Sequence, residues 1–120
     1  MADTVEQTRT WMAKHRFARI APRKASLVIG LIRGLPCDAA VEQLRFDSHR
    51  AARFVSNVLK SAMVNADEQE ADMRRLVVAE ARVDCGPHYR RWRPKDRGRA
   101  HPIIKRTSHI VVTVAERAEG

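Results

Sequence analysis

The clearest pattern along the chain is an amphipathic one between residues 48 and 69. Small and aliphatic residues recur there every three or four positions, at Ala51, Val55, Val58, Leu59, Ala62 and Ala66. Polar side chains fall between them, as at Arg53, Asn57 and Lys60. A period of about 3.6 residues predicts a helix whose apolar stripe packs on a core.

Two shorter helices are predicted before this one. The segment 21–34 begins with Pro22, which suits the first helical position, and ends with Gly34, which suits the C-terminal cap. Its apolar face consists of Ala25, Val28, Ile29 and Ile32. A second short helix follows Pro36, with Asp38 as its expected N-cap. Its inward residues are Val41 and Leu44.

The period changes to two in three other segments. Residues 76–85 alternate, and their charged residues Glu80, Arg82 and Asp84 fall on one predicted face. The opposite, inward face would carry Val77, Ala79, Ala81, Val83 and Cys85. Residues 107–116 are rich in β-branched side chains, and residues 11–20 also alternate, so both are predicted to be strands.

Strands 76–85 and 107–116 bracket a basic stretch with a turn signal at 94–98, which predicts a long hairpin from about residue 76 to residue 115. Each arm, of roughly 17 to 20 residues, would reach about 55 Å at about 3.3 Å per residue. A compact chain of this length has a radius of gyration of only about 14 Å. Most of the hairpin is therefore expected to project.

Length and composition set the class of protein. A chain of 120 residues fits one domain, here residues 1–120. No apolar run resembles a signal peptide or a membrane span, which predicts a cytoplasmic protein. Cys37 and Cys85 lie far apart and lack metal-type spacing. Both are expected to be buried, in a reduced compartment.

The positive charge is confined to two segments. Residues 7–37 carry seven basic residues and no acid, and residues 86–106 carry eight with one acid. The rest of the chain holds eight basic and thirteen acidic residues, although the whole chain is +9. Such segregation predicts a polyanionic partner, with nucleic acid first and an anionic membrane second.

The second basic segment favours RNA. Residues 86–100 contain five arginines and one lysine against Asp96. Guanidinium groups bind phosphate through two parallel hydrogen bonds and stack on bases. Tyr89 and Trp92 lie among these cations, and two interpretations of them stay open. They either stack on unpaired bases or pack against residues of the opposite strand as cross-strand pairs of the hairpin.

Enzymatic chemistry has little support in the sequence. We find no glycine-rich phosphate loop, no metal-spaced cluster of His and Cys, and no nucleophile motif. The five histidines are scattered. No catalytic, cofactor-binding or metal-binding residue is therefore predicted, and no cofactor.

Five blocks of the sequence resemble one known family. They are RIAPRKASLVIGLIRG (19–34), VLKSAMVNADE (58–68), VDCGP (83–87), RPKDRGRA (93–100) and KRTSHIVVTV (105–114). In order and over about residues 14 to 116, they resemble the large-subunit ribosomal protein family L twenty-two of bacterial type. The resemblance implies an α+β fold, with three helices packed on a small antiparallel sheet and a long protruding β-hairpin.

The family resemblance also implies a function. The chain would be a structural constituent of the large ribosomal subunit that binds ribosomal RNA, aids assembly and lines the nascent-peptide exit tunnel with its hairpin. Its partners would be ribosomal RNA, neighbouring ribosomal proteins and the nascent peptide, and neither a membrane partner nor a homo-oligomer is expected.

The resemblance divides the candidate residues into two groups. Those expected to bind ribosomal RNA are Lys14, Arg16, Arg19, Arg23, Lys24, Arg97, Arg99, Lys105 and Arg106. Those expected at the tunnel-facing tip of the hairpin are His88, Tyr89, Arg90, Arg91, Trp92, Arg93, Pro94 and Lys95.

A second function remains open on the residues alone. A helical body with basic β-arms is also typical of DNA-architectural proteins, whose arms enter the minor groove. Such proteins generally dimerise, and the sequence shows no dimer seam. Preference for duplex DNA over structured RNA would favour this alternative.

Overall fold

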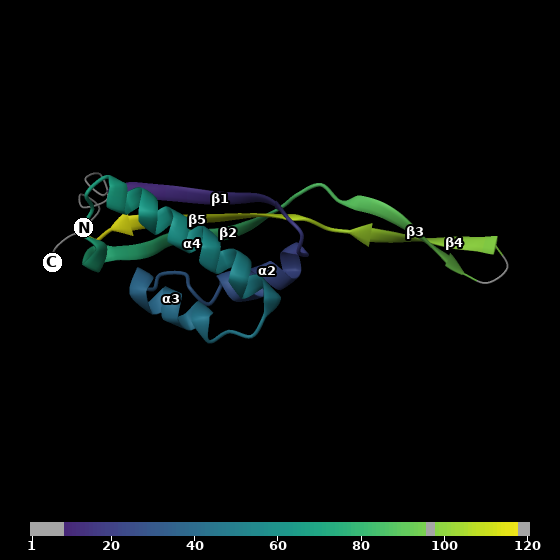
Figure 1. The fold of residues 1–120 in the computed structure, drawn as a ribbon, viewed down its shortest axis with the longest axis horizontal. Coiled ribbons are helices and arrows are strands. Elements are labelled where there is room, and N and C mark those ends of the chain that lie inside the picture. The colour runs from purple at the N-terminus through teal and green to yellow at the C-terminus, as the bar shows by residue number, and fades with distance from the viewer. Residues whose placement is uncertain (1–8, 96–97, 118–120) are drawn as a thin grey trace.

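The computed structural model describes residues 9–95 and 98–117, and of residues 93–95 and 99–102 it describes the backbone only. The chain forms a body of helices and strands at one end and a two-stranded hairpin at the other (Figure 1). Its principal extents are 68 × 28 × 26 Å, because the hairpin continues the long axis of the body.

A three-stranded antiparallel sheet forms one layer of the body. Its strands are β1 (Thr10–Ala18), β2 (Leu76–Cys85) and β5 (Ser108–Glu116), in the order β1-β5-β2. The central strand β5 is rich in β-branched residues, of which Ile110, Val112 and Val114 are fully buried. β-Branched residues suit such a strand because they pack well on a pleated surface.

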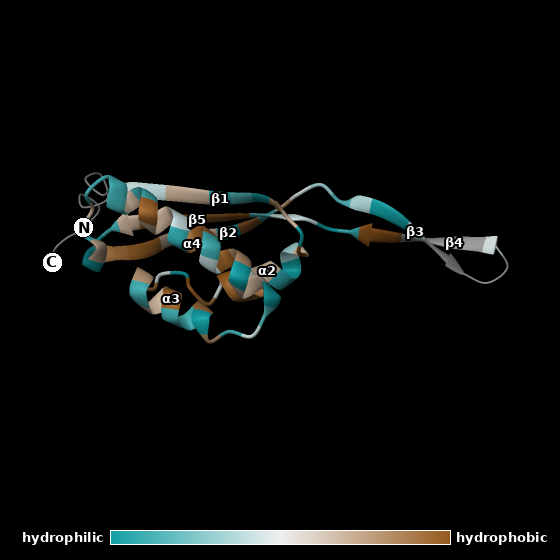
Figure 2. Ribbon diagram, viewed as in Figure 1, coloured by the Kyte–Doolittle hydropathy of each residue, from teal (hydrophilic) through white to brown (hydrophobic). Residues whose placement is uncertain are grey.

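Three helices cover one face of this sheet (Figure 1). They are α2 (Pro22–Ile29), α3 (Cys37–Arg45) and α4 (Arg50–Glu68). The buried stripe of α4 matches the predicted one and includes Ala52 as well. Figure 2 shows brown, apolar residues along β5 and β2 where the helices cover them. The predicted fold class, three helices on a small antiparallel sheet with a protruding hairpin, is confirmed.

The inward face of β2 differs from the predicted one. Leu76 and Val78 are buried in the first half of the strand, whereas Ala81 is buried in the second half. The cause is a β-bulge between Val78 and Glu80, which leaves Ala79 as an extra residue in the pairing with β5. One extra residue reverses the alternation, so Val77 and Ala79 do not belong to the inward face.

The first two helices also differ in their ends. The helix predicted over 21–34 ends at Ile29, and residues 30–34 form turns that keep Ile32 buried. Gly34 ends these turns with φ of +77°, where glycine is favoured. Asp38 is not the N-cap of α3, since Pro36 holds that position and Asp38 lies in the first turn.

The two cysteines have different environments, which corrects the expectation that both are buried. Cys37 is buried in the core, and this burial raises the pKa of its thiol to about 11, with a further contribution from the carboxylate of Asp38. Cys85 is exposed. Burial decreases along β2 from Ala81 to Val83 to Cys85, because the core ends where the chain leaves the sheet.

The hairpin consists of β3 (Tyr89–Lys95) and β4 (Arg99–Lys105), paired from Tyr89↔Lys105 to Lys95↔Arg99. β2 and β5 remain in the body sheet with β1, so only about half of the segment predicted to project does so. Of the predicted turn at 94–98, residues 96 and 97 lie outside the described part of the chain, and Gly98 has φ of +74°.

A compact junction joins the hairpin to the body. The N–H of Gly86 donates to the carbonyl of Thr107, and the Thr107 hydroxyl donates to the carbonyl of Pro87. A Cβ on residue 86 would lie 2.5 Å from Oγ1 of Thr107. The two chains therefore approach closely here because residue 86 has no side chain.

No described helix has the length and hydropathy needed to cross a bilayer.

Candidate nucleic-acid interface

A groove lies between the body and the base of the hairpin, and we call it the root groove. Its volume is about 1110 Å³. Three parts of the chain line it: the start of α2, the start of α4 and the hairpin arms next to the junction. The lining residues are Arg19, Ile20, Ala21, Lys24, Leu27, His49, Arg50, Ala51, Tyr89, Arg91, Ile104, Lys105, Arg106 and Thr107.

The root groove is strongly cationic. Six of its lining residues are Arg or Lys, and none of the lining residues is acidic. Within the described residues, none of these six cations forms an ion pair with a carboxylate. Unpaired cations gathered in a concave surface create a positive potential that attracts an anion.

The starts of two helices add to this potential. α2 begins beside Arg23 and Lys24, and α4 begins with Arg50. Neither helix has an acidic residue in its first turn or a side chain that caps it. The N-terminus of a helix carries partial positive charge, so cations there are unfavourable by about 0.3–1 kcal/mol each unless an anion binds. The arrangement suits phosphate.

Apolar and aromatic side chains lie among the cations. Leu27 is 67% exposed and Ile104 47% exposed, while Tyr89 is 45% exposed. The guanidinium of Arg91 lies 5.7 Å from the centroid of the Tyr89 ring. Riboses and bases have apolar faces that such side chains can contact, so the lining offers more than charge.

His49 is held at the edge of the root groove by Asp47. The Asp47 carboxylate accepts a hydrogen bond of 2.8 Å from the backbone N–H of His49 and also contacts its imidazole Nδ1. The backbone hydrogen bond, followed by the contacts with the imidazole, holds the pKa of Asp47 below its ordinary value. The pair fixes the backbone at the start of α4.

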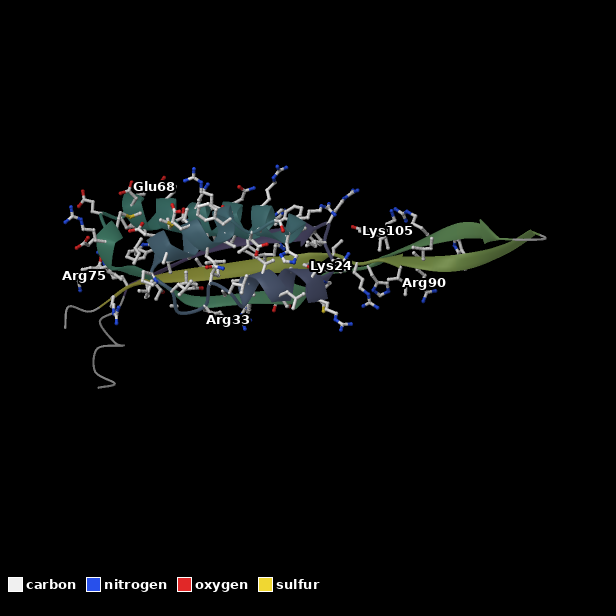
Figure 3. The ribbon with its side chains drawn as sticks, turned by 90° about the horizontal axis from the view of Figure 1, so that it is seen from below. Lys24, Arg33, Glu68, Arg75, Arg90 and Lys105 are labelled. Carbon is white, nitrogen blue, oxygen red and sulfur yellow. The ribbon has the colours of Figure 1, made fainter. Side chains whose placement is uncertain are left out.

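The structure brings together four of the residues predicted to bind ribosomal RNA. Arg19, Lys24, Lys105 and Arg106 all line the root groove, although they come from both ends of the sequence. In Figure 3, Lys24 lies at the end of the body next to the hairpin, and Lys105 and Arg90 extend from opposite sides of the hairpin.

The remaining members of that group lie elsewhere. Lys14 and Arg16 are exposed on β1, on the sheet face opposite α4, since the alternate residue His15 contacts Phe54 of α4. Arg23 is exposed on α2 but does not line the groove. The structure describes only the backbone of Arg99, and Arg97 lies outside the described residues.

The residues predicted for the hairpin tip are spread along the whole hairpin. Tyr89 and Arg91 lie at its base and line the root groove, and His88 precedes β3. Arg90 and Trp92 are exposed, with Trp92 64% exposed. For Arg93, Pro94 and Lys95 only the backbone is described, in the part of β3 nearest the turn.

Two basic residues of the first segment instead stabilise the body. Arg33 donates from Nε to the carbonyl of Ala81 at 2.7 Å, which ties the turns after α2 to β2. Arg9 pairs with Glu116 at 2.8 Å. The pKa of Glu116 lies below its ordinary value, first because the Asp72 N–H donates to it and then because of Arg9.

Sequence reasoning missed Arg50 and His49. The signal was present: a helix that starts with His-Arg, with no acidic residue in its first turn, opposes the usual preference for negative charge there. Among the described residues, no group of three His, Cys, Asp or Glu is placed to hold a metal ion.

Comparison with known proteins agrees with the geometry. Residues 13–115 match the family described as ribosomal protein L22p/L17e. The chain is 45% identical over 108 residues to the large ribosomal subunit protein uL22 of Hydrogenobaculum sp. (strain Y04AAS1), an alignment that covers 90% of this chain and 89% of that protein. This chain therefore belongs to the ribosomal protein L22p/L17e family.

Proposed function

We propose that this chain is a structural component of the large ribosomal subunit in the cytoplasm, and that it binds ribosomal RNA in the root groove. The family supports the first part, since the relative at 45% identity is a large ribosomal subunit protein. The observation that carries the second part is the groove itself, with six cations and no acid among its lining residues.

The groove suits RNA better than other anions. Its cations are arranged along a concave surface between the body and the hairpin, so they can follow a phosphodiester backbone. Tyr89, Leu27 and Ile104 supply faces for bases and riboses, which an acidic protein segment would not need. An RNA strand here would contact the body and the hairpin together and would fix the angle between them.

The hairpin has a proposed role of its own. Its seven residue pairs extend it by roughly 23 Å at about 3.3 Å per residue, far enough to pass between RNA helices. We propose that the part nearest the turn, with Trp92 to Lys95, lines the nascent-peptide exit tunnel. In this arrangement Tyr89 and Arg91 bind RNA at the base, and the proposed role is structural rather than catalytic.

Sedimentation tests the proposal. A tagged copy of the chain is expressed in the organism that makes it, and the cell lysate is run through a density gradient after a high-salt wash. The chain is expected to stay with the large subunit at one copy per particle. Loss of the chain in the wash would overturn the ribosomal assignment. Sedimentation with DNA would overturn it too and would favour the DNA-architectural alternative.

A further inference from the structure

Phe17 is unusual both in its exposure to solvent and in its backbone conformation. It is a large apolar side chain that is 47% exposed, at the end of the edge strand β1. Its backbone has φ of +60°, a left-handed conformation that side chains such as phenylalanine rarely adopt. A polar residue or glycine would suit this position better for stability. Residues that keep an unfavourable conformation often serve a function.

The structure holds this conformation in place through His109. A bulge between His15 and Ala18 interrupts the pairing of β1 with β5 and turns Phe17 out of the ladder. The N–H of Phe17 donates to Nδ1 of His109 at 3.0 Å. The two rings meet edge to face, with centroids 4.9 Å apart and planes at 86°. The contacts with His109 therefore fix the orientation of the Phe17 ring, although the ring faces solvent.

The surroundings of Phe17 are cationic. The guanidinium of Arg16 lies 5.2 Å from the ring centroid. Lys14 and Arg19 lie within three residues on either side, and residues 7–37 contain no acid. In the described part of the chain, neither Lys14 nor Arg16 forms an ion pair. An aromatic ring among unpaired cations suits a base with phosphates on both sides.

We propose that Phe17 is a stacking site for an unpaired base of RNA, with the Arg16 guanidinium over the ring and Lys14 and Arg19 binding the neighbouring phosphates. The stacking ring lies outside the root groove, because Phe17 and Arg16 do not line that groove, whereas Arg19 lines it and borders both sites. His109 acts as a positioning residue, since it holds the backbone and the ring of Phe17. The proposal rests on the proposed function, because it assumes that the partner is RNA.

A stacking site at Phe17 and a purely electrostatic site would prefer different forms of RNA. A base that stacks on a side chain must be unpaired, whereas phosphate contacts form with single strands and duplexes alike. Phe17 is therefore expected to contribute to the binding of single-stranded RNA and to contribute nothing to the binding of duplex RNA.

The test compares the full chain with Phe17→Leu, Phe17→Tyr and Phe17→Asn. Affinities are measured for a short single-stranded RNA and for a duplex RNA of the same length at one salt concentration. Phe17→Leu and Phe17→Asn are expected to weaken single-strand binding about fivefold or more and to leave duplex binding unchanged. Phe17→Tyr is expected to bind as the wild type does.

Stability and a second phenylalanine provide the controls. Phe17→Asn should unfold at the same denaturant concentration as the wild type or a higher one, because asparagine tolerates positive φ. Phe46→Leu alters a phenylalanine that is 80% exposed between α3 and α4, away from these cations, and should bind both RNAs normally. Ultraviolet crosslinking to the single strand, followed by mass spectrometry, should place a nucleotide on residue 17.

The outcomes separate the two proposals. If the wild type binds neither RNA, the proposed function fails. If the wild type binds and Phe17→Leu binds single strands equally well, the stacking site is wrong and the root groove stands. Equal losses in Phe17→Leu and Phe46→Leu would also overturn the stacking site.

Discussion

Neutralising part of the root groove should change the salt dependence of RNA binding by a predictable amount. The variant Lys24→Gln/Lys105→Gln/Arg106→Gln removes three cations that are exposed and have no described carboxylate partner. Glutamine keeps the first two methylene groups of each side chain, and the substitutions leave no described acid without its ion-pair partner. The body is therefore expected to fold normally.

The magnitude follows from counterion release. Each phosphate contact contributes about 0.7 to the slope of log K against log salt concentration for single strands and about 0.9 for duplexes. If each of the three residues contacts one phosphate, the slope of the variant should be less steep than that of the wild type by about 2 to 3. With equal affinities extrapolated to about 1 M salt, the variant should bind about 100- to 500-fold more weakly at about 0.1 M.

The assay is filter binding or fluorescence anisotropy with a large-subunit ribosomal RNA transcript over a range of salt concentrations. The control is Arg45→Gln/Lys60→Gln/Arg74→Gln, which removes the same net charge from exposed positions outside the groove. Its slope should change by less than about 1. Equal changes in the two triple variants would show that total charge, rather than the groove, determines binding, and would refute the reasoning.

Three further predictions concern the body and its junction with the hairpin. Gly86→Ala should lower the free energy of unfolding by about 1–3 kcal/mol, because the new Cβ displaces the Thr107 hydroxyl. The control Gly30→Ala, whose new Cβ would have its nearest neighbour at 3.4 Å, should not destabilise the protein. Equal urea midpoints for the two variants would contradict this prediction. In native protein at pH 8, iodoacetamide should modify exposed Cys85 quickly and Cys37, whose pKa is about 11, only after unfolding; equal rates measured by mass spectrometry would contradict the burial. Asp47→Asn should lower stability at neutral pH by on the order of 1 kcal/mol, because the asparagine amide oxygen can still accept the His49 N–H but lacks the negative charge that strengthens this bond. Since the folded-state pKa of Asp47 is lowered, this contribution is present above the ordinary value of 3.8 and is lost as the pH falls through the folded-state pKa, so a difference that persists unchanged at low pH would argue against it.

The sequence predicted the elements of the fold well, since each depends on local periodicity. The stripe of α4 from Ala51 to Ala66 and the strand character of 107–116 were both correct. The inward face of β2 was wrong because one extra residue at the bulge reverses an alternation that is otherwise regular. Periodicity is measured over a window, so a single-residue irregularity is averaged away.

Helix ends depend on contacts that are not local. Residues 30–34 continue the apolar pattern of α2, with Ile32 at the right spacing. The chain nevertheless turns there, because Gly34 donates to the carbonyl of Val78 and Leu35 accepts from the Val78 N–H. These bonds to β2 replace a further turn of helix. No pattern within residues 21–34 encodes them.

The root groove was predicted only in part. The family resemblance put Arg19, Lys24, Lys105 and Arg106 in one candidate group, and the structure brings all four to one groove, while their binding of RNA stays a prediction. Charge segregation did not show that α4 brings Arg50 to the same surface, because residues 48–69 as a whole are not basic. The length of the hairpin was clear, but the place where it leaves the body was not, since that depends on β1 pairing with β5.

The central claim is that RNA occupies the root groove, and electron cryomicroscopy of the large subunit that contains this chain tests it most directly. We predict an RNA backbone between the start of α2 and the hairpin, with phosphates in contact with Lys24, Lys105 and Arg106. A groove filled by solvent or by a segment of another protein, with RNA contacting the chain only elsewhere, would contradict the account.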